Sequence, residues 1–173
     1  MAKTTNNVSH TYFHHKNPLD GHPKLPHLGM LGDISQFRYK LVEGPWIITW
    51  NDYYYLFYSS GGFSQPVYHQ ACARSSSLTG SYTKSPHPVV AVDMDKYKRK
   101  ANCTWEGPGH GSVVQDSEGA WWLVYHAWVY GGVGVNPPGR EMLLDRLVMD
   151  EDGWPSVRGR VPSDKPCMKP VIK

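Results

Sequence analysis

Cysteine is scarce in this sequence, and the few cysteines present follow no known spacing. Cys72, Cys103 and Cys167 are the only three among 173 residues. They are odd in number and lack C-x-x-C spacing, so they fit neither a structural zinc site nor a closed disulfide framework. At most one disulfide can therefore form within the chain.

Long hydrophobic runs and dense basic stretches are also missing. No run approaches the ~18 apolar residues of a membrane-spanning helix, and Met1–Pro18 lacks the apolar stretch of a signal peptide. Eighteen basic and fifteen acidic residues give a net charge of +3. Beyond Lys96–Lys100 there is no Lys/Arg stripe of the kind that binds a phosphate backbone. The sequence therefore predicts neither a membrane nor a nucleic-acid partner.

What the sequence does contain is typical of a small all-β domain. Hydrophobic residues make up 40% of the chain and charged residues 19%, a balance that favours a folded core over disorder. Aromatic residues reach 13%, together with 17 Gly and 14 Pro. This composition predicts short strands joined by tight turns and no long helices.

Residues 1–40 differ from the rest because they sustain no period of 2 or 3.6. Prolines interrupt the segment, and five histidines, at positions 10, 14, 15, 22 and 27, are spaced irregularly. A metal site is one interpretation of these histidines, but no Cys, Asp or Glu cluster supports it. We interpret residues 1–40 as an irregular arm and residues 41–173 as the folded domain.

Within that domain the chain resembles itself. One repeat unit, about residues 41–92, begins near Glu43-Gly44-Pro45, and a second, about residues 104–160, begins near Glu106-Gly107-Pro108. Four short strands are expected in each unit: Trp46–Trp50, Tyr53–Ser59, Tyr68–Arg74 and a segment near Tyr82 in the first, and Gly111–Gln115, Ala120–Trp128, Met142–Met149 and a segment near Trp154 in the second. Each unit is predicted to be a four-stranded antiparallel meander.

A repeat of this size built from four short strands is typical of a β-propeller blade. Propellers usually close with four to eight blades, whereas this chain has room for about two to three. We therefore expect a partial propeller. Because each blade buries its faces against its neighbours, the chain must self-associate, pack the arm over its ends or belong to something longer.

Glu43 and His110 are the first candidate site residues, because the innermost strands of a propeller converge on a shared cleft. A carboxylic acid beside an apolar Gly-Pro-Trp wall can keep its proton near neutral pH, as a general acid must. The alternative is that Glu43 and Glu106 are turn residues that recur with the blade. The three glycines in Gly107–Ser112 indicate a close backbone approach that presents His110, although a lone histidine can also be purely structural.

Arg140 and Trp46 are candidates for binding a sugar. Arg140 follows Gly131–Pro138, a loop that can cover a cleft, and its planar guanidinium suits hydroxyls or a carboxylate; otherwise it is a surface arginine. Trp46 stands in the wall beside Glu43. Aromatic residues in strands can stack on sugar rings, but most often they pack the sheet, and His126 can face either the core or the cleft.

Several motifs occur in a fixed order: Val42–Trp46, Tyr53–Tyr58, Ala73-Arg74-Ser75 with Leu78-Thr79-Gly80, Gly107–Ser112, Val124-Tyr125-His126, Gly139-Arg140 and Asp152–Pro155. In combination they resemble glycoside hydrolase family 43 from about Leu41 to Val157. That family comprises five-bladed propellers that act as arabinofuranosidases, arabinanases and xylosidases. The resemblance implies hydrolysis of O-glycosidic bonds in arabinan- or xylan-type carbohydrate and an extracellular location.

The resemblance also implies roles for individual residues. Glu43 matches the family's general acid, in its third blade. His110 matches the histidine at the bottom of the cleft, which in many members lies beside a calcium or other ion. The resemblance therefore implies no required cofactor, and it is compatible with a structural calcium ion near His110. Arg140 looks like the arginine that contacts sugar hydroxyls near the acid.

The sequence departs from the family at the catalytic base. The family's aspartate base and its second, acid-tuning aspartate belong to the first two blades, and neither motif is found; Asp20 and Asp33 lie in the arm. Inverting hydrolysis needs an acid and a base about 6.5–9.5 Å apart. Three alternatives remain open: an inverting glycosidase completed by self-association, a lectin-like sugar-binding fragment without turnover, and an incomplete chain whose partner blades lie elsewhere.

Overall fold

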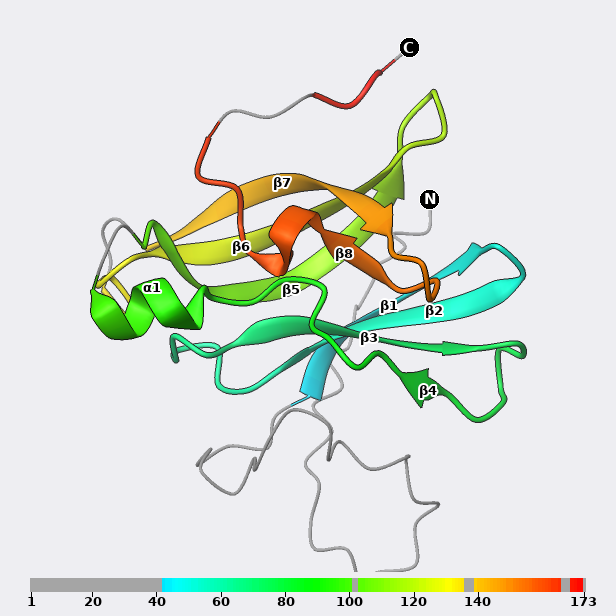
Figure 1. Cartoon of the computed structure of the whole chain (residues 1–173), viewed down its shortest axis with the longest axis horizontal. Helices are drawn as coiled ribbons and strands as arrows, with labels where there is room; N and C mark the ends of the chain where they lie inside the picture. Colours follow the sequence, from blue (N-terminus) through cyan, green and yellow to red (C-terminus); the bar gives the residue numbers. More distant parts are fainter. Residues whose placement is uncertain (1–41, 101–102, 136–138, 166–168, 173) are drawn as a thin grey trace, which may run out of the picture.

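The computed structural model describes residues 42–100, 103–135, 139–165 and 169–172, which form two four-stranded antiparallel sheets (Figure 1). The strands of the first sheet are β1 (Val42–Trp50), β2 (Tyr53–Ser60), β3 (His69–Ser75) and β4 (Thr83–Lys84), and those of the second are β5 (Trp105–Gln115), β6 (Trp121–Val129), β7 (Arg140–Met149) and β8 (Pro155–Val157). Strand order equals sequence order in both sheets. The meander predicted for each repeat unit is confirmed, whereas the predicted arm lies outside the described residues.

The first hairpin forms because its turn suits two antiparallel strands. Asn51 and Asp52 link β1 to β2 with φ angles of 47° and 63°, and two residues with positive φ are what a type I′ hairpin turn requires. Along β2, Tyr55 and Phe57 alternate with Leu56 and Tyr58, so that each pair faces one side of the sheet. Both faces of this aromatic strand are therefore packed.

The main hydrophobic core lies between the two sheets, and both sheets contribute to it. Its buried members are Ile48, Tyr55, Phe57, Cys72, Val89, Val90, Val113, Leu123, Tyr125, Leu147 and Val157. Val89 and Val90 come from the connection after β4, which hydrogen-bonds back to Gln70. The sheets are thus layers of one folded unit (Figure 1).

A side chain of the first sheet also fastens the β7–β8 turn of the second. Arg74 of β3 donates hydrogen bonds to the carbonyl oxygens of Asp152, at 2.8 Å, and Gly153, at 2.7 Å. Its guanidinium carbon lies 4.1 Å from the ring centroid of Trp154 and 4.9 Å from that of Tyr53. The residues that carried part of the family resemblance at this turn therefore hold the two sheets together.

The inner strands β1 and β5 bend at the same point of the repeat. Glu43 pairs with Ser59 and Trp46 with Phe57, so β1 holds one extra residue in a β-bulge. An equivalent bulge follows Glu106 in β5, and a second one lies between Gly109 and Ser112. The glycine after each glutamate has positive φ, 61° at Gly44 and 56° at Gly107, as such bulges require.

One short helix was not predicted from the sequence. Helix α1 (Met94–Arg99) begins at Asp93, whose side chain accepts a hydrogen bond from the Lys96 amide, and ends at Lys100 in the left-handed conformation. A 3-10 helix, η2 (Arg158–Arg160), follows β8. Among the described residues no helix is long and apolar enough to cross a membrane.

Candidate active site

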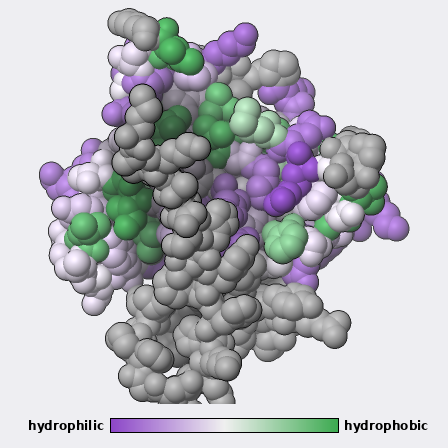
Figure 2. All heavy atoms as spheres, turned by 180° about the vertical axis from the view of Figure 1, so that it is seen from behind, coloured by the Kyte–Doolittle hydropathy of each residue, from purple (hydrophilic) through white to green (hydrophobic). Residues whose placement is uncertain are grey.

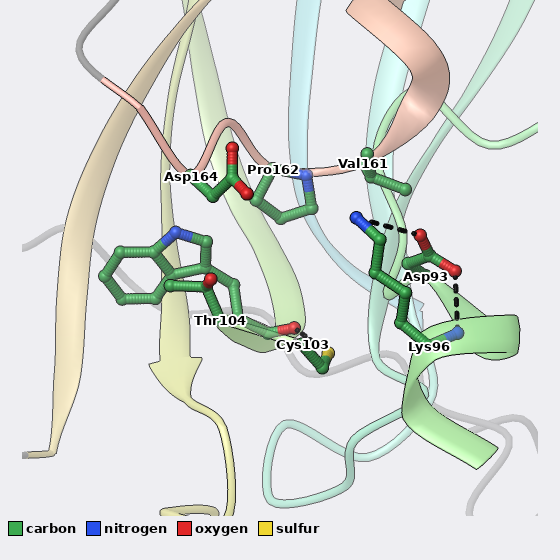
Figure 3. A pocket seen from close by; sticks show the side chains of 8 residues that line it. Asp93, Lys96, Cys103, Thr104, Val161, Pro162 and Asp164 are labelled. Carbon is green, nitrogen blue, oxygen red and sulfur yellow. Dashed lines mark hydrogen bonds and ion pairs between the residues drawn. The ribbon is translucent and has the colours of Figure 1, made fainter. Parts of the chain in front are cut away.

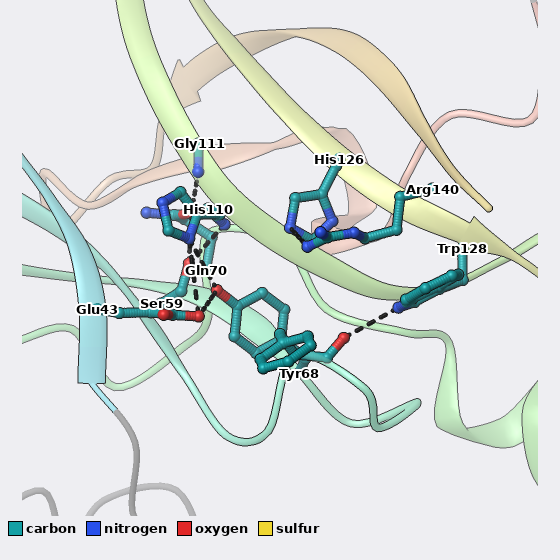
Figure 4. Close-up of polar contacts among 10 residues, drawn as sticks. Glu43, Ser59, Tyr68, Gln70, His110, Gly111, His126, Trp128 and Arg140 are labelled. Carbon is teal, nitrogen blue, oxygen red and sulfur yellow. Dashed lines mark hydrogen bonds and ion pairs between the residues drawn. The ribbon is translucent and has the colours of Figure 1, made fainter. Parts of the chain in front are cut away.

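Glu43, near the start of β1, belongs to a polar cluster where β1 meets β5 (Figure 4). The hydroxyl of Tyr68 donates a hydrogen bond to Glu43 Oε1 at 2.7 Å. His110 Nδ1 lies 3.6 Å from the same oxygen. The Glu43 side chain is 14% exposed and that of His110 is 47% exposed. The structure therefore brings together the two residues expected to share a site, with the acid mostly buried and the imidazole accessible.

A second histidine, His126 of β6, packs behind Tyr68. The two rings are parallel, with 5.8 Å between centroids and 2° between planes. Arg140 Nη1 lies 3.1 Å from His126 Nε2; because a guanidinium can only donate, Nε2 accepts and Nδ1 carries the ring proton. Burial, and then the charges of Arg140 and His110, lower the pKa of His126 to about 4. His126 is therefore a neutral ring near neutral pH.

The backbone around His110 is held by two buried polar side chains of the first sheet. The His110 amide donates to Ser59 Oγ at 2.6 Å, and the Gly111 amide donates to Gln70 Oε1 at 2.8 Å. Ser59 in turn donates to Gln70 Oε1 at 2.9 Å. His110 itself has a φ of 53°, an uncommon conformation for a residue with a side chain. These bonds hold His110 in a conformation that turns its ring toward Glu43.

The glycines near His110 leave room for the rings of the cluster. A Cβ atom at Gly109 would lie 2.5 Å from Tyr68 Cε1 and 3.0 Å from Ser59 Oγ. A Cβ atom at Gly44 would lie 3.3 Å from the His110 ring. The glycines that indicated a close backbone approach thus allow β5 to contact the residues around Tyr68.

Arg140 lies beside the cluster, at the start of β7, and is exposed. Its guanidinium carbon is 5.5 Å from the Trp128 ring centroid and 5.8 Å from that of Phe63, which is itself exposed. A guanidinium carries five donors, and the contact with His126 engages one nitrogen. This arrangement is compatible with the predicted contact to sugar hydroxyls, which stays a prediction.

Trp46 lies farther along β1 and is tied to the second sheet. Its indole N–H donates to the Val113 carbonyl oxygen at 2.9 Å, and 40% of the residue is exposed. The hydrogen bond of Trp46 joins β1 to β5. Its part in sugar binding stays a prediction.

Glu106, the counterpart of Glu43 in the second unit, has different surroundings. It is 2% exposed and accepts a hydrogen bond from the Val133 amide at 3.3 Å. The two glutamates therefore share a bulge but not an environment. Glu106 holds a loop, whereas Glu43 meets a tyrosine and a histidine at an accessible site.

The residues around His110 do not fit a calcium ion bound directly by side chains. Calcium takes six to eight oxygen ligands, whereas the carboxylate that meets His110 is that of Glu43. Within the described part of the chain, no three His, Cys, Asp or Glu side chains come close enough to hold a metal. The ion that the resemblance implied stays a prediction, and we derive no chemical step through it.

A small cavity of about 60 Å³ lies elsewhere, between helix α1, the start of β5 and the segment after η2 (Figure 3). Asp93, Lys96, Cys103 and Asp164 are among its lining residues. Lys96 Nζ pairs with Asp93 Oδ2 at 3.4 Å. None of the predicted site residues lines it, so we interpret it as a packing gap beside the helix.

Reasoning from the sequence missed Tyr68, Ser59 and Gln70. Tyr68 was predicted only as the first residue of a strand, although it precedes β3 and its hydroxyl reaches Glu43. Ser59 and Gln70 are both fully buried. Polar residues at inward positions of otherwise apolar strands were the available signal, because a buried polar group needs a partner.

Comparison with protein families gives a match over most of the chain. The family model described as "Glycosyl hydrolases family 43" matches residues 11–155, so the match begins before the described strands. Two similar proteins are the non-reducing end alpha-L-arabinofuranosidase BoGH43B of Bacteroides ovatus, 32% identical over 125 residues, and the extracellular exo-alpha-(1->5)-L-arabinofuranosidase ArbA of Cellvibrio japonicus, 30% identical over 131 residues. The matches cover 66% and 74% of this chain but only 21% and 36% of those relatives.

Solved structures agree with these matches. The Bacteroides ovatus xyloglucan PUL GH43B has a TM-score of 0.61 at 30% identity, covering 72% of this chain and 24% of that one. The Cellvibrio cellulosa alpha-L-arabinanase complexed with arabinohexaose has a TM-score of 0.52 at 28% identity, covering 67% and 36%. The predicted all-β partial propeller is confirmed by these similarities and by the two sheets.

Proposed function

The chain belongs to glycosyl hydrolases family 43, and from this premise we propose that it takes part in hydrolysis of O-glycosidic bonds in arabinose- or xylose-containing polysaccharides, with Glu43 as the general acid. The names of its relatives include arabinofuranosidases and a xylosidase/arabinosidase of Humicola insolens. These names support the two sugars as candidates but do not choose between them.

The position of Glu43 is the observation that carries this proposal. Its carboxyl group is mostly buried, one oxygen is bound by Tyr68, and the neighbouring His110 ring is open to solvent. A general acid must hold a proton in a site that excludes bulk water and release it to the leaving oxygen. Glu106, which shares the repeat position but is bound within a loop, lacks this access.

The catalytic base must come from another carboxylate. Among the described residues, the side chains that contact the Glu43 carboxyl group are those of Tyr68 and His110, and neither carries a carboxylate. An inverting enzyme activates water with a base about 6.5–9.5 Å from the acid. We propose that a second copy of the chain supplies this group, with Asp33 of the same chain as the alternative to test by substitution.

Hydrolysis of arabino- and xylo-oligosaccharides, whose sugar leaving groups need protonation by the acid, tests the proposal with and without Glu43. The wild-type chain is expected to cleave at least one of them. Glu43→Gln removes the transferable proton but keeps the shape of the side chain, so turnover should fall about 10²–10⁴-fold while oligosaccharide binding stays within about tenfold. Calorimetric titration measures the binding.

Glu106→Gln is the matched control, because it makes the same change at the equivalent position of the other repeat. It is expected to keep wild-type turnover. Wild-type turnover in Glu43→Gln would remove Glu43 from the mechanism. Sugar binding by the wild-type chain without product at any concentration would leave only a carbohydrate-binding fragment.

A further inference from the structure

Tyr68 is a buried residue whose polar end reaches the proposed acid. The residue is 0% exposed. Its hydroxyl lies 2.7 Å from Glu43 Oε1 and 3.5 Å from His110 Nδ1. Figure 4 shows the hydroxyl pointing at the Glu43 carboxylate. A tyrosine placed only to fill the core would not need its hydroxyl at this point.

We propose that Tyr68 is the positioning residue of Glu43: its hydroxyl donates to Oε1 and thereby fixes the orientation of the carboxyl group. The consequence for catalysis rests on the proposed acid role of Glu43, whereas the contact itself does not. With Oε1 occupied by Tyr68, the transferable proton resides on Oε2. Tyr68 touches no substrate in this proposal and acts through Glu43 alone.

The surroundings hold the Tyr68 ring in one place. His126 stacks on it in parallel at 5.8 Å. Near its edge, the missing side chain of Gly109 leaves just enough space, since a Cβ atom would lie 2.5 Å from Cε1. A ring confined in this way presents its hydroxyl in a fixed direction, which is what holding a carboxyl group within a narrow range of angles requires.

The charges around the pair make Tyr68 the donor. Burial, with a smaller contribution from the Glu43 carboxylate, raises the pKa of Tyr68, so the hydroxyl keeps its proton. Among the described residues, the other titratable or charged groups facing the pair are His110 from β5, His126 from β6 and Arg140 from β7. His126 is neutral and already accepts from Arg140. At 2.7 Å, against 3.5 Å for His110 Nδ1, the carboxyl oxygen of Glu43 is the acceptor for the Tyr68 proton.

This bond matters most after the proton has left. In the proposed step the O–H bond at Oε2 breaks and the proton passes to the glycosidic oxygen, whose bond to the anomeric carbon breaks with its electron pair going to that oxygen. Water, which gives a proton to the base, forms the new bond to the anomeric carbon. Glu43 is left as a carboxylate. A hydrogen bond to a charged acceptor is about twice as strong as one to a neutral acceptor. Tyr68 therefore stabilises the acid more as the proton departs.

The contact is tested by carbon-13 NMR of the glutamate side chains, which needs no turnover. The chain has only five glutamates, and Glu43→Gln identifies the Glu43 Cδ resonance by removing it. Tyr68→Phe should move that resonance, because its hydrogen bond is lost. Tyr58→Phe is the matched control, since Tyr58 is a buried tyrosine on the other face of the first sheet. An unchanged Glu43 resonance in Tyr68→Phe overturns the proposal.

The reciprocal measurement uses the ring of Tyr68 and does not depend on whether Tyr68→Phe folds. Glu43→Ala, which unlike Glu43→Gln leaves no side-chain oxygen to accept the bond, should move the Cζ resonance of Tyr68 and leave that of Tyr58 in place. If the Tyr68 resonance stays where it was, the hydroxyl does not bind Glu43 and the proposal fails.

Kinetics test the consequence for catalysis. Tyr68→Phe, which removes the hydrogen bond that positions the acid, should lower kcat at least about tenfold for a substrate with a sugar leaving group. For a nitrophenyl substrate the loss should be less than about threefold, because nitrophenol needs little protonation, and KM should be nearly unchanged for both. An equal loss for both leaving groups would mean a merely structural role. If the wild-type chain cleaves neither substrate, the proposed function fails, while the resonances still decide whether Tyr68 holds Glu43.

Discussion

At position 109 a glycine is needed because another residue's ring occupies the space. The Cβ of an alanine there would lie 2.5 Å from Tyr68 Cε1 and 3.0 Å from Ser59 Oγ. Gly109→Ala should therefore displace Tyr68 and lower the free energy of unfolding by about 1–3 kcal/mol, the usual cost of overpacking. Urea denaturation measures this loss.

Gly131→Ala separates steric from backbone effects. Gly131 has a φ of 77°, and a Cβ atom added there would meet no other atom within 4 Å, so only the backbone conformation is strained. A loss in Gly109→Ala no larger than that in Gly131→Ala would show that the Tyr68 ring yields easily.

The sequence predicted that Glu43 and His110 lie near each other, and the structure places them 3.6 Å apart, but it did not predict contacts that depend on the third dimension. Glu43 and His110 were placed together because the repeat sets both at inner strands. Tyr68 was not, because an aromatic residue next to a strand most often packs the sheet. Likewise, three glycines indicated a close approach without revealing that the Tyr68 ring was the neighbour.

At the scale of elements, Arg74 is the contact that joins β3 to the β7–β8 turn. It donates to two carbonyl oxygens and lies over the Trp154 ring. Arg74→Ala removes charged hydrogen bonds worth about 1.5–3 kcal/mol each and leaves the carbonyls without their donor. We expect chemical denaturation to show a loss of about 2–4 kcal/mol, because the carbonyl of the exposed Asp152 can regain water.

Arg158→Ala is the control for Arg74, because Arg158 is exposed in η2. Its free energy of unfolding should change by no more than about 0.5 kcal/mol. If both variants lose the same stability, Arg74 does not join the two sheets energetically.

Strand positions were predictable from alternation and turns, but strand starts were not. β1 begins at Val42 and β5 at Trp105, several residues before the predicted starts, because the Glu-Gly-Pro segments remain in the ladder through bulges. Gly and Pro ordinarily end strands, which is why the sequence suggested a turn there. Helix α1 was missed because six residues are too few to give a periodic signal.

At the scale of the whole molecule, exposed hydrophobic residues favour association. Figure 2 shows hydrophobic patches between hydrophilic areas on the rear face. Ile47, Val114, Met142 and Val148 are each more than two fifths exposed. Because large apolar patches are unusual on a stable monomer, sedimentation at micromolar concentration should show a dimer or a larger species. If a second copy supplies the base, activity per chain should fall on dilution.

Met142→Lys tests the surface directly, because Met142 is 79% exposed on β7. The charge should shift the association to higher protein concentration. A monomer in the wild-type chain, with activity strictly proportional to concentration, would instead require a base within the same chain.

Two partly buried imidazoles make stability depend on pH. Burial lowers the pKa of His69, and burial together with Arg140 and His110 lowers that of His126 to about 4. The unfolded chain binds these protons at higher pH than the folded chain does, so stability is complete above the ordinary value of about 6.5 and declines as pH falls toward 4. The Tm should therefore be lower at pH 5 than at pH 7.5.

His87→Gln, at an exposed position, should leave this pH dependence unchanged, whereas His126→Gln should reduce it. Calorimetric melting at both pH values measures the effect. A Tm that rises between pH 7.5 and pH 5 would contradict the burial of the two rings.

The hydrogen bonds that form each sheet join strands that are consecutive in the sequence, whereas the bonds that form the site join residues far apart in the sequence. Each ladder joins strands that are neighbours along the chain, whereas the bond from the Gly111 amide to Gln70 spans 41 residues and the Trp46 indole bond spans 67. Closing a longer loop costs more conformational entropy. An opening between the two sheets would part Glu43, in the first sheet, from His110, in the second, without breaking a bond within either ladder. Secondary structure alone is therefore no measure of an intact site.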